Sequence, residues 1–204
     1  MCKIKICGLF RRADAAAVNA AMPDYAGFVC WPHSRRYVTP KAAADLKRLL
    51  DPAIQTAGVF VDAALDEILS LADSGTVDIV QLHGHESEEV IRTLRQARPG
   101  LPIWKAFVIR TLEDIRRAEQ TEADMPLLDN GYGTGRAFDH SLIAAFSRPY
   151  ILAGGLTAEN LPQVLTQYHP AAVDLSSGVE TEGLKDPAKI LQAVQTVHHI
   201  KKEI

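Results

Sequence analysis

Two short turns in the last third of the sequence have the composition of a phosphate-binding site. Gly154-Gly155-Leu156 follows one apolar run, and Ser176-Ser177-Gly178 follows the next. Glycines let backbone N–H groups approach phosphate oxygens, and serine hydroxyls add further donors. A glycine pair alone is usually only a turn, but two such turns after consecutive apolar runs favour phosphate. The candidate phosphate-binding residues are therefore Gly154, Gly155, Ser177 and Gly178.

Side chains that can transfer protons close several other apolar runs. Cys7, His83 and Asp129 stand at such ends. A lone cysteine is more often a small buried hydrophobe, and an aspartate here could instead cap a helix. His83 and His85 resemble half of a metal site, but the sequence offers no third ligand, so we expect no metal. The chemistry then depends on whether the fold brings these ends together.

Short β-like runs alternate with amphipathic helix-like runs along the whole chain, in eight strand–helix units. We expect strands at 3–7, 25–30, 56–61, 77–82, 101–107, 125–129, 149–154 and 171–176. Helix start signals lie at Thr39-Pro40 and Asp186-Pro187, and also at Asp62 and Ser87. Pro162 would break a helix interior, so we expect that helix to begin near Asn160.

Eight such units predict an α/β protein, a single (β/α)8 TIM-barrel domain over residues 1–204. A doubly wound open sheet is the alternative, but the first strand lacks the GxGxxG turn of a dinucleotide fold. In a barrel the strand ends listed above share one face, where the active site lies. Strand alternation turns Lys5 and Cys7 inward, and Asp174 is then a possible partner for the buried Lys5.

The composition is that of an ordinary globular protein. The 204 residues are 47% hydrophobic and 23% charged, with a net charge of −3, which argues against disorder. The absence of a basic excess argues against nucleic acid and anionic membranes, and no apolar run is long enough to span a bilayer. The three cysteines form no CxxC pair, so we expect a cytoplasmic protein with reduced thiols.

Several segments in order along the chain resemble the phosphoribosylanthranilate isomerase family of tryptophan biosynthesis. The matching segments include KICG (5–8), GFVCWPHSRRYV (27–38), QLHG (81–84), LLD (127–129), GTGRAFD (133–139), AGGLTAEN (153–160) and VDLSSGVE (173–180). The resemblance implies the same fold, a (β/α)8 barrel of the ribulose-phosphate-binding type. Cys30 departs from the family, which usually has an aromatic residue there.

The resemblance also implies an isomerase that performs an Amadori rearrangement. N-(5-phosphoribosyl)anthranilate would become 1-(2-carboxyphenylamino)-1-deoxyribulose 5-phosphate without any cofactor. Cys7 would be the general base, Asp129 the general acid, and Arg36 the residue that binds the anthranilate carboxylate. The remaining substrate-site residues would be His83, Gly133 and Asp174. We expect a monomer with a small-molecule substrate and no obligatory protein, nucleic-acid or membrane partner.

These roles require the site to raise the pKa of Asp129 and to lower that of Cys7, for which Lys5 is a candidate. The loop Gly131–Gly135 is a candidate cover for the site, and Trp31, Phe107 and Phe138 could wall an aromatic ring or belong to the core. Alternatives are a histidine-pathway isomerase, indole-glycerol-phosphate synthase or a non-catalytic phosphate-ligand carrier. The first would have an aspartate in place of Cys7, and the second would need more than Lys105. A carrier would need neither Cys7 nor Asp129.

Overall fold

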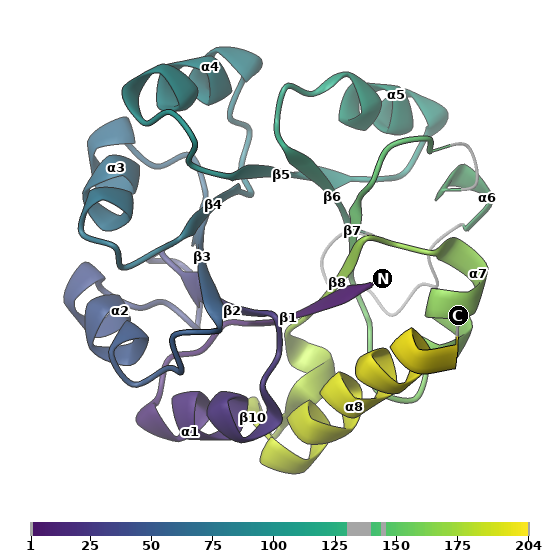
Figure 1. Cartoon of the computed structure of the whole chain (residues 1–204). Helices are drawn as coiled ribbons and strands as arrows, with labels where there is room; N and C mark the ends of the chain where they lie inside the picture. The colour runs from purple at the N-terminus through teal and green to yellow at the C-terminus, as the bar shows by residue number, and fades with distance from the viewer. Residues whose placement is uncertain (1, 130–139, 144–145, 204) are drawn as a thin grey trace.

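Eight parallel strands close into a barrel in the computed structural model, which describes residues 2–129, 140–143 and 146–203 (Figure 1). The ring closes because β1 pairs with both β2 and β8. The barrel strands are β1 (Lys3–Cys7), β2 (Tyr25–Val29), β3 (Gln55–Phe60), β4 (Ile79–Leu82), β5 (Ile103–Val108), β6 (Met125–Asp129), β7 (Ile151–Ala153) and β8 (Ala172–Leu175). The predicted (β/α)8 barrel is confirmed, and the open doubly wound sheet was the wrong alternative.

Helices form an outer ring around these strands (Figure 1). They are α1 (Arg12–Ala21), α2 (Pro40–Lys47), α3 (Leu65–Asp73), α4 (Glu88–Ala97), α5 (Leu112–Gln120), α6 (His140–Ile143), α7 (Leu161–Tyr168) and α8 (Pro187–Glu203). Within the described ranges, none of them has both the length and the apolar character needed to cross a membrane.

Most of the predicted helix starts are confirmed. Thr39 caps α2, where its hydroxyl accepts from the backbone N–H of Ala42, and Asn160 precedes α7 with Pro162 in the first turn. The prediction for Asp62 is wrong, because α3 begins three residues later, after Ala64. Asp62 instead accepts a 2.6 Å hydrogen bond from the backbone N–H of His85. It therefore ties together the loops that follow β3 and β4.

After β8 the chain forms small elements that the sequence pattern did not indicate. A 3-10 turn, η1 (Ser177–Val179), leads into an antiparallel hairpin of β9 (Glu180–Thr181) and β10 (Leu184–Lys185). This hairpin matters for function because it contains Glu180 and Lys185, and Glu180 contacts Arg36 of the site described below.

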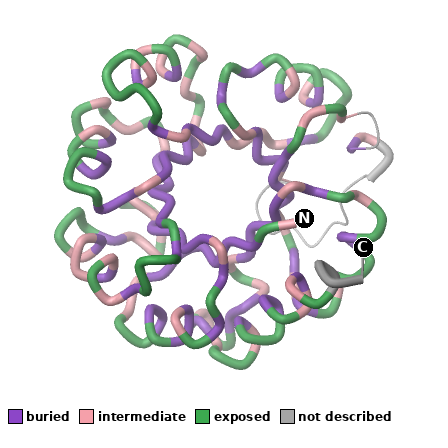
Figure 2. Tube along the Cα trace, viewed as in Figure 1, coloured by how far each residue is buried: buried purple, intermediate pink, exposed green. Residues whose placement is uncertain are grey.

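The ring of barrel strands is largely buried (Figure 2), and strand alternation sorts its apolar side chains into two layers. Ile4 and Ile6 of β1 point outward into the large layer between strands and helices. A smaller layer fills the barrel interior and consists of Tyr25, Ala57, Ile79, Trp104, Leu127, Ile151, Ala153 and Ala172. Lys5 and Cys7 lie on the inward face, as predicted, and Lys5 is completely buried. The barrel interior therefore changes from apolar to polar toward the carboxyl ends of the strands.

Candidate active site

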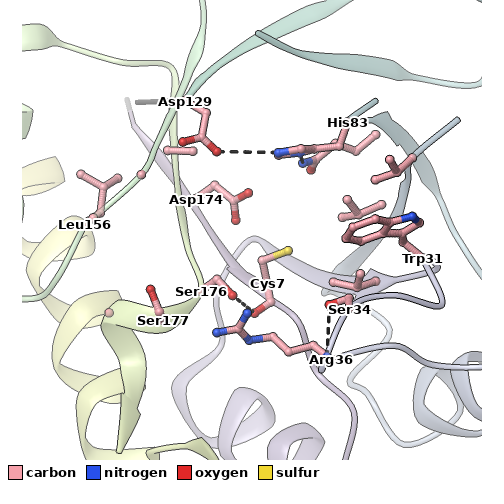
Figure 3. A pocket seen from close by; sticks show the side chains of 18 of the residues that line it. Cys7, Trp31, Ser34, Arg36, His83, Asp129, Leu156, Asp174, Ser176 and Ser177 are labelled. Atoms are coloured by element: carbon pink, nitrogen blue, oxygen red, sulfur yellow. Dashed lines mark hydrogen bonds and ion pairs between the residues drawn. The ribbon is translucent and has the colours of Figure 1, made fainter. Parts of the chain in front are cut away.

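A cavity of about 340 Å³ opens at the carboxyl ends of the barrel strands (Figure 3). It brings together nine of the ten residues predicted from the sequence, which are Cys7, Arg36, His83, Asp129, Gly154, Gly155, Asp174, Ser177 and Gly178. The tenth, Gly133, lies outside the described residues, as do the loop 131–135 and Phe138. Trp31 also lines the cavity, whereas Phe107 is not among its lining residues.

Cys7 ends β1 and points into the cavity above Lys5, which is two residues earlier on the same strand. The Lys5 ammonium pairs with Asp174 Oδ2 at 2.8 Å, which confirms the predicted pair. Burial raises the pKa of Cys7, and the positive charges of Lys5 and Lys185 offset this only in part. The prediction of a lowered Cys7 pKa is therefore wrong for this structure, because the cost of desolvating a thiolate is the largest effect.

Asp129 faces the cavity from the end of β6, with His83 beside it (Figure 3). His83 Nε2 lies 3.7 Å from Asp129 Oδ2, and His83 Nδ1 lies 3.0 Å from the amide nitrogen of Gln81. Gln81 Oε1 in turn accepts a 2.6 Å hydrogen bond from Lys5. A continuous polar chain therefore runs from the lysine beneath Cys7 to the carboxyl group of Asp129.

His85 does not join His83. Its side chain is almost fully exposed, and its Nδ1 lies 3.4 Å from Asp62 Oδ2 at the outer rim. Among the described residues, no group of three or more histidine, cysteine, aspartate or glutamate side chains is placed to hold a metal ion.

Arg36 reaches the cavity from the loop after β2, and Glu180 fixes its position. Its Nε and Nη2 donate to the two Glu180 carboxylate oxygens at 2.6 and 2.8 Å. Arg35 and Lys185 also donate to this carboxylate, at 2.5 and 2.8 Å. Burial alone would raise the pKa of Glu180, but hydrogen bonds from Arg36 and Lys185 lower it to about 2. Glu180 thus occupies the Nε–Nη2 edge of the Arg36 guanidinium. Arg36 nevertheless lines the cavity.

The two small-residue turns line the cavity after β7 and β8, on the side away from Trp31 and His83 (Figure 3). Gly154 and Gly155 have φ angles of 92° and 67°, a backbone conformation that glycine adopts without strain. A Cβ on Gly178 would stand 1.8 Å from the carbonyl oxygen of Leu156. The close approach of the two turns therefore depends on the missing side chain at Gly178.

The chain also matches a known protein family over nearly its whole length. Residues 4–196 match the model of the family described as N-(5'phosphoribosyl)anthranilate (PRA) isomerase. The chain belongs to this family. Family membership decides against the sibling barrels and the phosphate carrier, and it makes this chain an isomerase.

Individual members of the PRA isomerase family align with nearly the whole chain. The N-(5'-phosphoribosyl)anthranilate isomerase of Endomicrobium trichonymphae is 42% identical over 205 residues, which are 98% of this chain and 100% of that protein. The crystal structure of phosphoribosyl anthranilate isomerase from Thermotoga maritima superposes with a TM-score of 0.89 at 34% identity. That match covers 98% of this chain and 100% of the other.

A further solved structure of a PRA isomerase contains a ligand. It is a complex with reduced 1-(o-carboxyphenylamino)-1-deoxyribulose 5-phosphate, at 33% identity and a TM-score of 0.87, and covers 98% of this chain and 100% of that chain.

Three residues that build the site were missed by the sequence analysis as such. Gln81 and Glu180 lie in segments that match the family, but the sequence analysis assigned no role to either of them or to Lys185. Strand alternation along β4 puts Gln81 on the same face as His83, two residues later, but it does not show that Gln81 contacts Lys5. No local pattern indicated that Glu180 contacts Arg36, because the two residues are 144 positions apart.

Proposed function

We propose that this chain converts N-(5'-phosphoribosyl)anthranilate to 1-(2-carboxyphenylamino)-1-deoxyribulose 5-phosphate in tryptophan biosynthesis, with Cys7 as base and Asp129 as acid. The observation that carries the proposal is that a thiol, a carboxyl group, an arginine and a candidate phosphate site line one cavity. The related structure that binds a reduced form of this product supports the choice of ligand.

The two anionic ends of the substrate fix its orientation in the cavity. The phosphate binds at the turns of Gly154-Gly155 and Ser177-Gly178, where backbone N–H groups and a hydroxyl are donors. The anthranilate carboxylate binds the Nη1–Nη2 edge of Arg36, because Glu180 takes the Nε–Nη2 edge. The ribose then lies between these anchors, next to Cys7 and Asp129.

Asp174 is suited to bind a ribose hydroxyl. Its Oδ2 is paired with Lys5, whereas its buried Oδ1 has no hydrogen-bond partner in the described part of the chain. A buried carboxylate oxygen without a donor is costly, and a sugar hydroxyl at the cavity would supply that donor. We include Gly133 as a further substrate-site residue on the basis of the family pattern.

The reaction begins with opening of the ribose ring. The carboxylic acid form of Asp129 gives its proton to the ring oxygen as the bond from that oxygen to C1′ breaks. The anthranilate nitrogen supplies its lone pair to C1′ and forms a protonated Schiff base. The Schiff base makes the hydrogen on C2′ acidic.

Cys7 completes the rearrangement as a base. Its thiolate removes the C2′ hydrogen, and the electron pair of that C–H bond forms the C1′–C2′ double bond of an enolamine as the nitrogen becomes neutral. Tautomerisation then moves a proton to C1′ and leaves the ketone at C2′. All steps are proton transfers between the enzyme and the substrate or bond shifts within the substrate, so the sequence of steps needs neither metal nor nicotinamide.

The active microstate needs no net change of charge. Burial favours the thiol form of Cys7, so we propose that the thiolate forms when a proton moves from Cys7 to Asp129 in the complex. The thiolate and carboxylic acid together have the same charge as the thiol and carboxylate. Lys5 stabilises the thiolate once it has formed, because its charge lowers the pKa of Cys7.

The test is conversion of phosphoribosylanthranilate, followed by the loss of anthranilate fluorescence. Cys7→Ala and Asp129→Ala should each lower kcat by about 100-fold or more while the circular dichroism spectrum is preserved. Cys30→Ala and Asp62→Ala are matched controls outside the cavity and should keep wild-type turnover. Wild-type rates in both site variants would contradict the assigned roles, and a wild-type protein without turnover would contradict the function.

We also propose that the enzyme acts as a cytoplasmic monomer without a protein, nucleic-acid or membrane partner. A single chain already supplies the proposed base, acid and arginine of the cavity, and Cys7 and Cys30 are free thiols. A relative from Thermotoga maritima is described as dimeric, so the state of this chain needs its own measurement. Light scattering after gel filtration should give the mass of one chain, and a stable dimer would contradict the proposal.

A further inference from the structure

The amide of Gln81 has its orientation dictated by a buried lysine. Lys5 Nζ lies 2.6 Å from Gln81 Oε1 and 2.8 Å from Asp174 Oδ2, and both Lys5 and Gln81 are almost completely buried. An ammonium group can only donate hydrogen bonds, so the amide oxygen must face Lys5. The amide nitrogen of Gln81 is thereby turned to the opposite side, toward His83.

This orientation determines which ring nitrogen of His83 holds the proton. Gln81 Nε2 lies 3.0 Å from His83 Nδ1, and an amide NH₂ group can only donate. His83 Nδ1 must therefore be the acceptor, without a hydrogen of its own. A ring protonated at both nitrogens would place two donors against each other at this contact. The neutral ring consequently has its hydrogen on Nε2.

The Nε2 hydrogen of His83 is directed at the proposed acid. Nε2 lies 3.7 Å from Asp129 Oδ2, a distance that closes to a hydrogen bond with a small movement of either side chain. A donor at Oδ2 keeps that oxygen an acceptor. When Asp129 is a carboxylic acid, its own proton therefore stands on the other oxygen, Oδ1, and is delivered from there.

We infer that Gln81 is a positioning residue that holds His83 in its Nε2–H tautomer, so that His83 always presents a donor to Asp129. The inference rests on the proposed function, in which Asp129 is the acid. It gives a chemical reason for a glutamine in the barrel interior. Lys5 acts at Asp129 through two intervening side chains, Gln81 and His83. The direction of each hydrogen bond in this series follows from the fixed charge of the lysine.

Replacement of Gln81 by glutamate turns the hydrogen-bond donor at the Nε2 position into an acceptor. Gln81→Glu keeps the shape of the side chain and its acceptor for Lys5, but it puts an acceptor where the NH₂ group was. His83 Nδ1 would then have to hold a hydrogen. The ring would become either the Nδ1–H tautomer or the doubly protonated form.

The decisive measurement is the tautomer itself, by nitrogen NMR of protein labelled with ¹⁵N-histidine. His83→Gln, which removes one signal, assigns the His83 resonances. We expect the Nε2–H pattern for His83 in the wild type and a protonated Nδ1 in Gln81→Glu. A wild-type Nδ1–H ring would overturn the inference even if the enzyme isomerises phosphoribosylanthranilate. Absent turnover with an Nε2–H ring would instead count against the proposed function.

Kinetics supply the second readout. Gln81→Glu should lower kcat about tenfold or more and change KM about twofold or less, because the substrate anchors are untouched. His83→Gln retains an NH₂ donor near the position of Nε2 and should keep more of kcat than His83→Leu, which has none. This pair tests the donor even if Gln81→Glu does not fold. Equal kcat values for His83→Gln and His83→Leu would contradict the need for a donor.

Discussion

Replacement of Glu180 tests whether a buried cluster of charges stabilises the fold more than an exposed ion pair does. Its carboxylate is nearly buried and accepts hydrogen bonds from Arg35, Arg36 and Lys185 at 2.5 to 2.8 Å. Glu180→Gln keeps the side-chain shape but removes the negative charge. Three positive groups then remain around a neutral amide, and two of them, Arg36 and Lys185, are largely or fully removed from water. Loss of one partner of a buried charge cluster is strongly destabilising.

The size of the effect follows from the pKa of Glu180. A shift from 4.5 to about 2 is equivalent to about 3 kcal/mol of folding free energy, at about 1.4 kcal/mol per pKa unit. Arg35 is more than half exposed, and the water around it screens part of this, so we expect a loss of about 2–3 kcal/mol at neutral pH. A lowered carboxyl pKa stabilises the fold above the ordinary pKa of 4.5. This contribution is lost as the pH falls toward about 2.

The assay is urea denaturation of the wild type and of Glu180→Gln, near neutral pH and at about pH 3. By about pH 3, roughly 2 kcal/mol of the wild-type advantage should be gone, because much of Glu180 is protonated only in the unfolded chain. Glu122→Gln is the matched control, since Glu122 pairs with Arg92 at 2.6 Å but both side chains are about half exposed. The control should change stability by about 0.5 kcal/mol or less. Equal effects for both variants, or a difference that does not narrow at low pH, would refute the reasoning.

Three further predictions concern the cavity. Because burial raises the pKa of Cys7, its alkylation in the ligand-free enzyme, followed by peptide mass spectrometry, should accelerate only above the ordinary value of 9.0; a midpoint below that value would contradict this. Gly178→Ala places a Cβ against the Leu156 carbonyl, so calorimetry should show about tenfold or more weaker binding of a phosphorylated product analogue, and unchanged affinity would count against the phosphate site. Arg36→Lys loses planar bidentate pairing and should raise KM about tenfold with little change in kcat, whereas a loss confined to kcat would rule out a carboxylate anchor.

Much of the architecture could be predicted from local patterns. The period-two alternation of KIKIC placed Lys5 and Cys7 inside the barrel and Ile4 and Ile6 outside, because successive side chains of a strand point to opposite faces. Strand order was also predictable, since parallel strands joined by helices close in sequence order. Helix starts were read correctly where a capping hydroxyl precedes a proline, as at Thr39. The prediction that Asp62 starts a helix was wrong because its side chain accepts a hydrogen bond from His85, in the loop after the neighbouring strand. No local sequence pattern indicates that contact.

The chemical identity of the site was likewise present in the sequence by itself. Cys7, Asp129 and the glycine turns are fixed by residue type and by their position at strand ends, and the barrel rule places all such ends on one face. These positions predicted the fold and the face on which the site lies, whereas the class of reaction followed from the resemblance of the matching segments to the PRA isomerase family.

Only the tertiary structure decided how the groups in the cavity are charged and aimed. The pKa of Cys7 rises because burial outweighs the lysine beneath it, and the sequence contains no measure of burial. Glu180 holds Arg36 across 144 residues, and Lys5 orients Gln81 across 76. Desolvation and hydrogen-bond direction depend on the atoms that surround a group in space, and in a closed barrel most of those atoms come from distant parts of the chain.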